Sequence, residues 1–267
     1  MAQPLDRRIA IVGAGPAGIA AAARLARAGI GVVIFEARDQ IGGALNMIPQ
    51  ERLPHDVIER DWSFIQHDGH IDLRLNAPID DITQLCKDYD GVIVATGEPH
   101  CMALGIDGEA LSVSYMDYLH DPQKYATTGA VAVIGGGMVG CETAEYLAAR
   151  GCKVSVIEMM DKIAAGESTT ILPTLLENYK TYGVEQYPSH KVKEFRMDAV
   201  VCENKDGAEV TIPCDYIVLA MGARSNEFDA AALEAAGIPV YSIGDAAGKA
   251  ADISNAIRTG YDTACQL

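Results

Sequence analysis

The hexapeptide GAGPAG at residues 13–18 decides the fold. It follows the apolar run IAIV at 9–12 and opens an alanine-rich segment that ends at Gly29, after which VVIF at 32–35 leads into Glu36. A strand, a Gly-x-Gly-x-x-Gly turn, a helix and a second strand that ends in an acid are the fingerprint of a dinucleotide-binding unit. We therefore expect a parallel α/β fold with a nucleotide at this turn.

The same pattern returns 122 positions later. VAVI at 131–134 precedes GGGMVG at 135–140, the next segment ends at Gly151, and VSVI at 154–157 leads into Glu158. A single Gly-x-Gly-x-x-Gly motif is weak evidence, whereas two copies, each with an acid 23 residues after its first glycine, indicate an internal repeat. The alternative for each copy is a set of turns in an α/β fold that binds no ligand.

The three glycines of each motif have separate physical roles. The first makes the tight turn, the second lets a pyrophosphate approach the backbone, and the third lets helix and strand pack closely. The helix N-terminus favours phosphate, and the closing carboxylate accepts hydrogen bonds from ribose hydroxyls. Because Met159 and Met160 rather than an arginine follow Glu158, the second copy is predicted to prefer NAD(H) over NADP(H).

Each half closes with a related apolar strand, at 91–97 and at 216–222. Such runs suit parallel strands whose carboxyl ends adjoin a bound dinucleotide. Polar residues and Pro122 near 111–130 predict a crossover between domains. The expected architecture is two Rossmann-like dinucleotide-binding domains, the second inserted into the first: residues 1–122 and 224–267 form one domain, and residues 123–223 form the other.

The remaining segments have weaker patterns. The segment 240–247 predicts a short strand that delivers Asp245 into a loop of small residues, although a Gly-Asp pair alone is more often a simple turn. The other predicted elements are helices at 54–65, 171–182, 230–236 and 252–265, strands at 71–75, 192–195, 200–203 and 210–212, and a turn at 205–207.

Composition excludes several classes of protein. The 267 residues are 49% hydrophobic and 22% charged, which is typical of a globular chain. The net charge of −16 disfavours nucleic acid and anionic lipid surfaces as partners. Residues 9–23 carry no charge and follow Arg7 and Arg8, as in a signal peptide, but they hold three glycines and a proline and fall short of the roughly 18 residues of a membrane helix. We expect a cytoplasmic protein with no membrane partner.

The seven cysteines include no Cys-x-x-Cys pair, which predicts reduced thiols in a cytosolic protein. It also removes the dithiol that an enzyme like thioredoxin reductase needs. The six histidines include no His-x-x-x-His pair, so no metal site is expected.

The order of motifs resembles the two-dinucleotide-binding-domain flavoproteins across nearly the whole chain. The motifs are the two glycine turns, Glu36, Gly42-Gly43, Ala95-Thr96-Gly97, Ala220-Met221-Gly222 and Gly244-Asp245. Residues 135–147 and 156–160 are similar to the FAD/NAD half of 2-enoate and 2,4-dienoyl-CoA reductases, relatives of trimethylamine dehydrogenase. Residues 48–54, IPQERLP, resemble a stretch of the glutamate synthase small subunit.

This resemblance implies FAD at the first turn and NAD(H) at the second. FAD would have Gly13, Gly15 and Gly18 at its pyrophosphate, Glu36 at its ribose and Arg38 on the adenine side. Glu142 would lie near the nicotinamide, or it is an ordinary carboxylate in the first turn of a helix; both interpretations stay open. No catalytic residue and no metal ligand is expected. The expected cofactor-binding residues are Gly13, Gly15, Pro16, Ala17, Gly18, Glu36, Ala37, Arg38, Gly43, Ala44, Leu45, Asn46, Arg52, Ala95, Thr96, Gly97, Gly135, Gly137, Met138, Val139, Glu142, Glu158, Gly222, Gly244, Asp245 and Ser254.

The function implied is an NADH:acceptor oxidoreductase module that passes hydride from NADH to FAD and electrons onward to a partner flavin, an iron–sulfur centre or another acceptor. The reductases named above carry a flavin-containing barrel and cluster cysteines upstream, and this sequence begins at the first strand. It is therefore expected to be a free-standing module, a subunit or an excised domain. The alternatives are a self-sufficient NADH diaphorase or quinone reductase, and a structural module that binds ADP or FAD without redox turnover.

Overall fold

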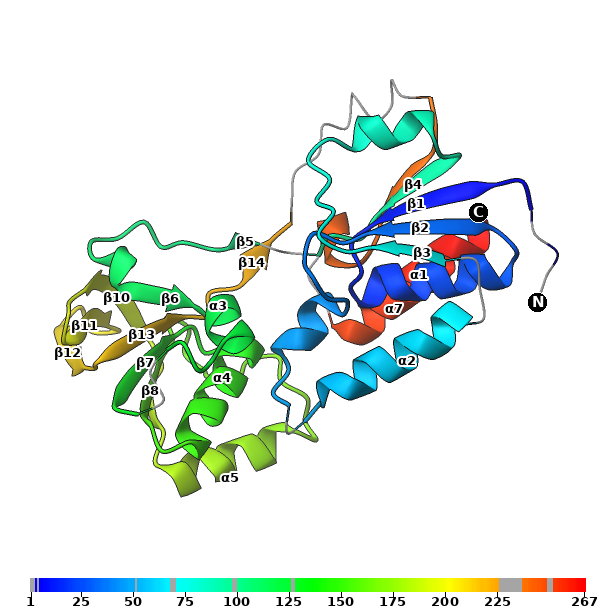
Figure 1. The fold of residues 1–267 in the computed structure, drawn as a ribbon. Helices are drawn as coiled ribbons and strands as arrows, with labels where there is room; N and C mark the ends of the chain where they lie inside the picture. The colour runs from blue at the N-terminus through cyan, green and yellow to red at the C-terminus, as the bar shows by residue number, and fades with distance from the viewer. Residues whose placement is uncertain are drawn as a thin grey trace. The chain divides into compact units, whose positions relative to one another are not determined.

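The computed structural model describes residues 3, 5–50, 52–67, 71–97, 100–125, 128–225, 237–248 and 252–267. The chain forms two compact units (Figure 1): Met1–His100 with Ala223–Leu267, and Cys101–Gly222. The first boundary therefore lies at residue 100 rather than at the expected 122. The predicted helix at 230–236 lies outside the described residues.

The first unit is built on a five-stranded parallel sheet with the order β15-β4-β1-β2-β3. Helices α1, α2 and α7 lie on one side of this sheet (Figure 1). The apolar residues of the strands alternate between the helical face and a face covered by the short helix η2. The elements are β1 (Arg8–Val12), α1 (Pro16–Arg27), β2 (Gly31–Phe35), η1 (Gly43–Met47), α2 (His55–His67), β3 (Ile71–Arg74), η2 (Ile82–Lys87), β4 (Gly91–Val94), β15 (Val240–Ser242), η4 (Gly244–Ala247) and α7 (Ile253–Gln266).

Helices α1 and α7 pack almost backbone to backbone. A Cβ atom added to Gly260 of α7 would lie under 3.0 Å from the carbonyl oxygen of Ala17 in α1. Only glycine permits this approach, because any side chain at position 260 would overlap the α1 backbone. The last helix of the chain is therefore held against the helix that begins at the first glycine turn.

The second unit repeats the parallel sheet, with the order β6-β13-β7-β8-β9, and adds the antiparallel sheet β10-β11-β12. The predicted turn at 205–207 connects β11 and β12. The elements are η3 (Glu109–Leu111), β6 (Ser112–Ser114), α3 (Tyr115–His120), β7 (Ala130–Ile134), α4 (Met138–Ala149), β8 (Lys153–Ile157), α5 (Leu172–Tyr182), β9 (Glu185–Tyr187), β10 (His190–Phe195), β11 (Ala199–Asn204), β12 (Glu209–Pro213) and β13 (Tyr216–Leu219). The short strands β5 (His100–Cys101) and β14 (Ala223–Arg224) form a two-stranded sheet.

The prediction that residues 111–130 form a plain crossover is wrong. This segment contributes β6 and α3, and β6 pairs in parallel with β13 from Ser112 to Ser114. Serines and single apolar residues give a three-residue edge strand too little hydrophobic pattern to be recognised from sequence. The pairing places this segment within the second sheet.

The sequence repeat is also a repeat of hydrogen bonds at the ends of the sheets. The N–H of Asp90 donates to the carbonyl of Arg8 at 2.9 Å, and the Asp90 carboxylate accepts the Arg8 N–H at 2.7 Å. In the second unit Asp215 makes the same pair with Ala130, at 2.7 and 2.8 Å. Each aspartate thus fixes the start of the strand that leads into a glycine turn.

We expect Asp215→Ala to lower the free energy of unfolding of the second unit by about 1–2 kcal/mol, because it leaves the Ala130 N–H without its carboxylate acceptor. Urea denaturation followed by circular dichroism measures the change. Asp215→Asn keeps a side-chain oxygen and is expected to lose less. Equal unfolding midpoints for the wild type and the alanine variant would contradict a role for this contact.

Candidate functional site

The first glycine turn joins β1 to α1 and has no room for a side chain at Gly13 or Gly18. Gly13 has φ +107°, and a Cβ atom there would lie under 3.0 Å from the carbonyl oxygen of Ala95 in the turn after β4. A Cβ atom on Gly18 would overlap the carbonyl oxygen of Gly13. Gly15, the N-cap of α1, supplies no side-chain cap, so the first N–H groups of the helix stay available to a ligand. We call residues 13–18 with Glu36 the first cradle.

Glu36 is the single buried charged residue among those that the structure describes, with 7% of its surface exposed. Its carboxylate accepts the N–H groups of Ala14 at 2.7 Å and Arg38 at 2.9 Å. A carboxylate has about four acceptor positions, so two remain for the hydroxyls of a ribose. These two contacts fix the direction in which the carboxylate points.

The predicted segment at 42–47 contacts the first cradle. Gly42 donates its N–H to Ala14, and a Cβ atom on Gly43 would lie 3.0 Å from the Cα of Gly15. Asn46 is buried and donates from its side chain to Ile41 O at 2.8 Å, which holds the Gly43–Met47 turn in place. Ala44 is exposed and Leu45 is half-buried on this turn.

Thr96 follows β4 at the end of the sheet where the first cradle lies. Its hydroxyl oxygen is buried and has no hydrogen-bond partner among the described residues. A buried hydroxyl without a partner is costly, and a polar group of a ligand would satisfy it. Together with the space that only glycines leave, this oxygen shows that the first cradle fits a bound dinucleotide.

The C-terminal segment supplies the next predicted residues. Gly244 donates its N–H to the Thr259 hydroxyl at 3.0 Å, and a Cβ atom on Gly244 would lie 3.1 Å from the Cβ of Ala17. Asp245 follows it in the first turn of η4. Ser254 lies exposed at the start of α7, and Arg52 lies exposed on the segment before α2.

The second glycine turn joins β7 to α4 with the same geometry. Gly135 has φ +105°, and a Cβ atom there would lie under 3.0 Å from Ala220 O, while one on Gly140 would overlap Gly135 O. The carboxylate of Glu158 accepts the N–H of Gly136 at 2.6 Å. We call residues 135–140 with Glu158 the second cradle.

The second cradle also holds the predicted residues at the start of α4 and after β13. Met138 and Val139 lie exposed in the first turn of α4, and Gly222 lies exposed after β13. Glu142 is exposed on α4, whose first turn contains no acidic residue. The interpretation of Glu142 as a first-turn carboxylate is therefore wrong.

A frame of backbone hydrogen bonds surrounds Glu36 at the edge of the first cradle. The N–H of Glu36 donates to Arg74 O at 2.9 Å, and its carbonyl accepts the Ala77 N–H at 2.8 Å. The carbonyl of Arg38 accepts the N–H of Asn76, which has φ +53°. No sequence motif indicates this frame.

The same frame surrounds Glu158. Its N–H donates to Tyr187 O at 3.0 Å, and its carbonyl accepts the His190 N–H at 2.9 Å. The carbonyl of Met160 accepts the N–H of Ser189, which has φ +57°, and the Met160 N–H donates to the Glu158 carboxylate at 2.7 Å. A residue with positive φ thus follows the next strand in both cradles.

The two frames differ in their side chains. Where the first has Arg38, Arg74 and Ala77, the second has Met160, Tyr187 and His190. The 122-residue repeat does not reveal this match, because the segments that begin at 74 and at 187 are separated by 113 positions. The second frame therefore lacks the two arginines of the first.

The cysteines supply no redox pair. All seven are free, and burial raises the pKa of Cys202 and Cys214 to about 11 and raises that of Cys141. A raised pKa keeps these thiols protonated and poorly nucleophilic at neutral pH. In the described part of the chain, His, Cys, Asp and Glu form no group of three able to hold a metal ion. No helix among the described residues is both long and apolar enough to cross a bilayer.

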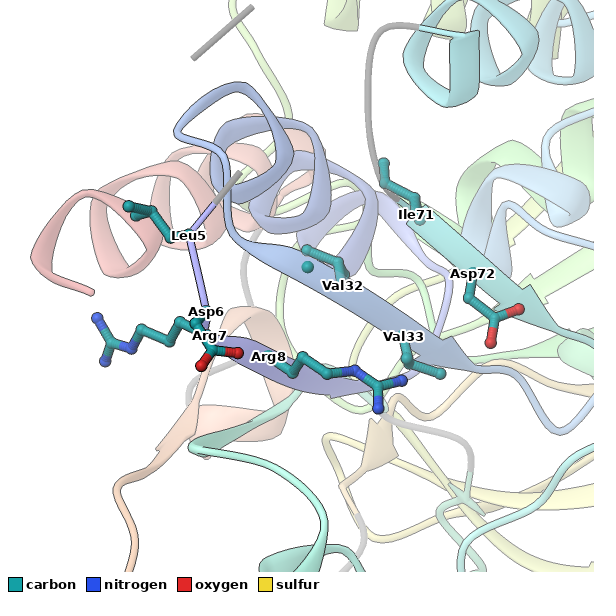
Figure 2. Close-up of a pocket in the computed structure, with 9 residues that line it drawn as sticks. Leu5, Asp6, Arg7, Arg8, Val32, Val33, Ile71 and Asp72 are labelled. Carbon is teal, nitrogen blue, oxygen red and sulfur yellow. The ribbon is translucent and has the colours of Figure 1, made fainter. Parts of the chain in front are cut away.

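A separate pocket of about 500 Å³ lies at the beginnings of β1, β2 and β3 (Figure 2). Ligands of parallel α/β sheets bind at the carboxyl ends of the strands, which is where both cradles lie. This pocket is at the opposite end of the sheet and is not the dinucleotide site. Its lining residues are Leu5, Asp6, Arg7, Arg8, Gly31, Val32, Val33, Ile71 and Asp72.

The chain is similar in sequence to known proteins. The chain is 40% identical over 262 residues to bilirubin reductase of Mediterraneibacter gnavus (strain CC55_001C), covering 96% of this chain and 40% of that protein. It is 32% identical to NADH oxidase of Thermoanaerobacter brockii, covering 99% and 41%. The chain thus spans about two fifths of the length of these curated relatives.

The solved structure of 2-naphthoyl-CoA reductase in complex with 2-naphthoyl-CoA is also similar. The TM-score is 0.86 at 28% identity, covering all of this chain and 41% of that one. These similarities confirm the resemblance to flavoproteins and the parallel α/β fold.

A match to one protein family covers nearly the whole chain. It extends over residues 7–260 and includes both cradles. Proteins of this family bind FAD and NAD(P)H. The chain belongs to the pyridine nucleotide-disulphide oxidoreductase family.

Proposed function

We propose that the chain is the FAD- and NADH-binding module of an NADH:acceptor oxidoreductase. The observation that carries the proposal is the presence of two cradles with the same glycine geometry and the same glutamate frame on one chain. FAD takes the first cradle and NAD(H) the second. Two longer relatives, a bilirubin reductase and an NADH oxidase, support an oxidoreductase role.

The residues of the first cradle bind and orient FAD. The backbone at Gly13, Gly15 and Gly18 receives its pyrophosphate at the start of α1, Glu36 accepts its ribose hydroxyls, and the Thr96 hydroxyl gains a partner. FAD, when bound, supplies the ability to accept a hydride and to release electrons singly or in pairs. No acidic or basic side chain is required for this chemistry.

The residues of the second cradle select NAD(H) over NADP(H). Two backbone N–H groups hold the Glu158 carboxylate, so it stays at the position of a ribose and repels a 2′-phosphate. In the first cradle Arg38 occupies the frame position that Met160 occupies in the second. The second frame has neither of the two arginines of the first, so it offers no such arginine to a 2′-phosphate.

The electron acceptor is proposed to be a flavin or an iron–sulfur centre of a partner subunit or of a longer protein that contains this module. This proposal is supported by the length of the relatives. The chain matches only about two fifths of each of them, as expected for one part of a larger electron-transfer system.

The visible spectrum before and after anaerobic addition of NADH tests this function. A yellow protein with flavin absorption that bleaches with NADH is expected. A colourless protein that holds ADP would instead support a structural module, and a yellow protein that neither NADH nor NADPH bleaches would contradict the proposal. A protein that bleaches rapidly with NADPH alone would contradict the assignment of NAD(H).

The double variant Glu158→Ala/Met160→Arg is expected to raise the preference for NADPH, measured as the ratio of kcat/KM for NADPH to that for NADH, by about tenfold or more. The change removes the repelling carboxylate and adds an arginine where the frame already accepts one in the first cradle. Met197→Arg, which adds an arginine on the exposed turn between β10 and β11, is the control for the added arginine. An unchanged ratio in the double variant would argue against this site of selection.

A further inference from the structure

Three exposed methionines lie next to the second cradle along the chain. Met138 is the first residue of α4, and Met159 and Met160 follow Glu158. Their exposed fractions are 45%, 61% and 57%, so all three sulfur-bearing side chains are accessible from solvent. We call these residues the methionine rim.

The rim is fixed in place by the backbone. Met160 donates its N–H to the Glu158 carboxylate and accepts the Ser189 N–H at 2.7 Å. Met138 follows Gly137, the extended N-cap of α4, which supplies no capping side chain. The methionines thus lie on the two segments that bracket the second cradle.

The first cradle has no such rim. The residues 122 positions earlier are Pro16, Ala37 and Arg38, none of which carries sulfur. The chain holds nine methionines in all, so three of them at one of two equivalent sites is a local concentration.

We propose that the methionine rim is an oxidation site that lowers the affinity of the second cradle for its dinucleotide, an inference that rests on the proposed function. Hydrogen peroxide is the oxidant: its O–O bond breaks, one oxygen forms an S–O bond with the thioether, the sulfur loses two electrons, and water is released. Methionine sulfoxide reductases reverse this change.

Two physical effects weaken binding after oxidation. A sulfoxide is polar and presents an oxygen where the thioether offered a soft apolar surface to the adenosine. At Met138 this oxygen lies at the helix N-terminus, where it competes with pyrophosphate for unpaired N–H groups. Met47 lies on the turn beside the first cradle but is only partly exposed, so we expect FAD to be retained while the affinity for the second dinucleotide falls.

The test uses the FAD-loaded protein and NAD⁺, which leaves the flavin oxidised. Protein is treated with limiting hydrogen peroxide and then with dithiothreitol to restore thiols, sulfoxides are located by mass spectrometry, and the Kd for NAD⁺ is measured by calorimetry. We expect the Kd to rise about tenfold with the flavin absorption unchanged, and to recover after treatment with both methionine sulfoxide reductases.

Two variants make the test specific. Met197→Leu, which removes a methionine that is 86% exposed on the turn between β10 and β11, is expected to show the same rise as the wild type. Met138→Leu/Met159→Leu/Met160→Leu is expected to show no rise relative to its own untreated Kd. If that variant does not fold, recovery of the wild type with the reductases remains as the independent measurement.

An unchanged Kd with sulfoxides present at the rim would overturn the inference and leave the proposed function intact. A rise that persists in the triple variant would also overturn it. An untreated wild type that does not bind NAD⁺ would overturn both the inference and the proposed NAD(H) site.

Discussion

Gly13→Ala yields a chain that does not retain FAD and whose first unit unfolds more easily by about 3 kcal/mol or more. The added methyl group meets the Ala95 carbonyl at under 3.0 Å, and the φ of +107° is strained for alanine. The backbone must move at the point where the pyrophosphate is proposed to bind. Flavin absorbance after gel filtration and the urea midpoint measure the two effects.

The matched control is Gly237→Ala in the same unit. Gly237 also has a positive φ, +74°, but a Cβ atom there meets nothing within 4 Å. It is expected to cost only about 1–2 kcal/mol and to leave FAD bound. Equal behaviour of the two variants would show that crowding at the first cradle does not decide cofactor retention.

Gly140→Ala tests whether the second cradle can be disrupted without loss of FAD from the first. The methyl group overlaps the Gly135 carbonyl oxygen, so the start of α4 must move away from the turn after β7. We expect a yellow protein whose rate of flavin reduction by NADH falls at least about 100-fold, because misplacement of a binding turn by 1 Å has effects of this size. Stopped-flow absorbance measures the rate.

The control for this variant is Gly207→Ala on the turn between β11 and β12, where a Cβ atom meets nothing within 4 Å. It is expected to be reduced at nearly the wild-type rate. Loss of FAD from Gly140→Ala would contradict the independence of the two cradles.

The sequence predicted the cradles because glycine turns have strict local requirements. Gly13, Gly135 and the two glutamates are specified within about 25 residues of chain, and in the structure each glutamate accepts a hydrogen bond from its glycine turn. The contacts of Asp90 and Asp215 were not predicted, because each joins segments more than 80 residues apart.

The frame around each glutamate was also not predictable. It depends on a residue with positive φ after the next strand, and neither Asn76 nor Ser189 belongs to a motif. The prediction for the segment containing β6 was wrong for a different reason. A three-residue edge strand is defined by its partner β13 and not by its own sequence pattern. The glutamate frames and β6 both depend on pairing between segments that lie far apart in the sequence.

The backbone contact between Gly260 and Ala17 has a consequence for the order of events during synthesis on the ribosome. Helix α1 is translated before its partner α7, and the whole second unit, residues 101–222, lies between them in the sequence, so the early half of the first unit waits until that unit has been translated. The second unit is continuous in sequence and can complete its own core meanwhile. Assembly of the first unit therefore follows translation of the second.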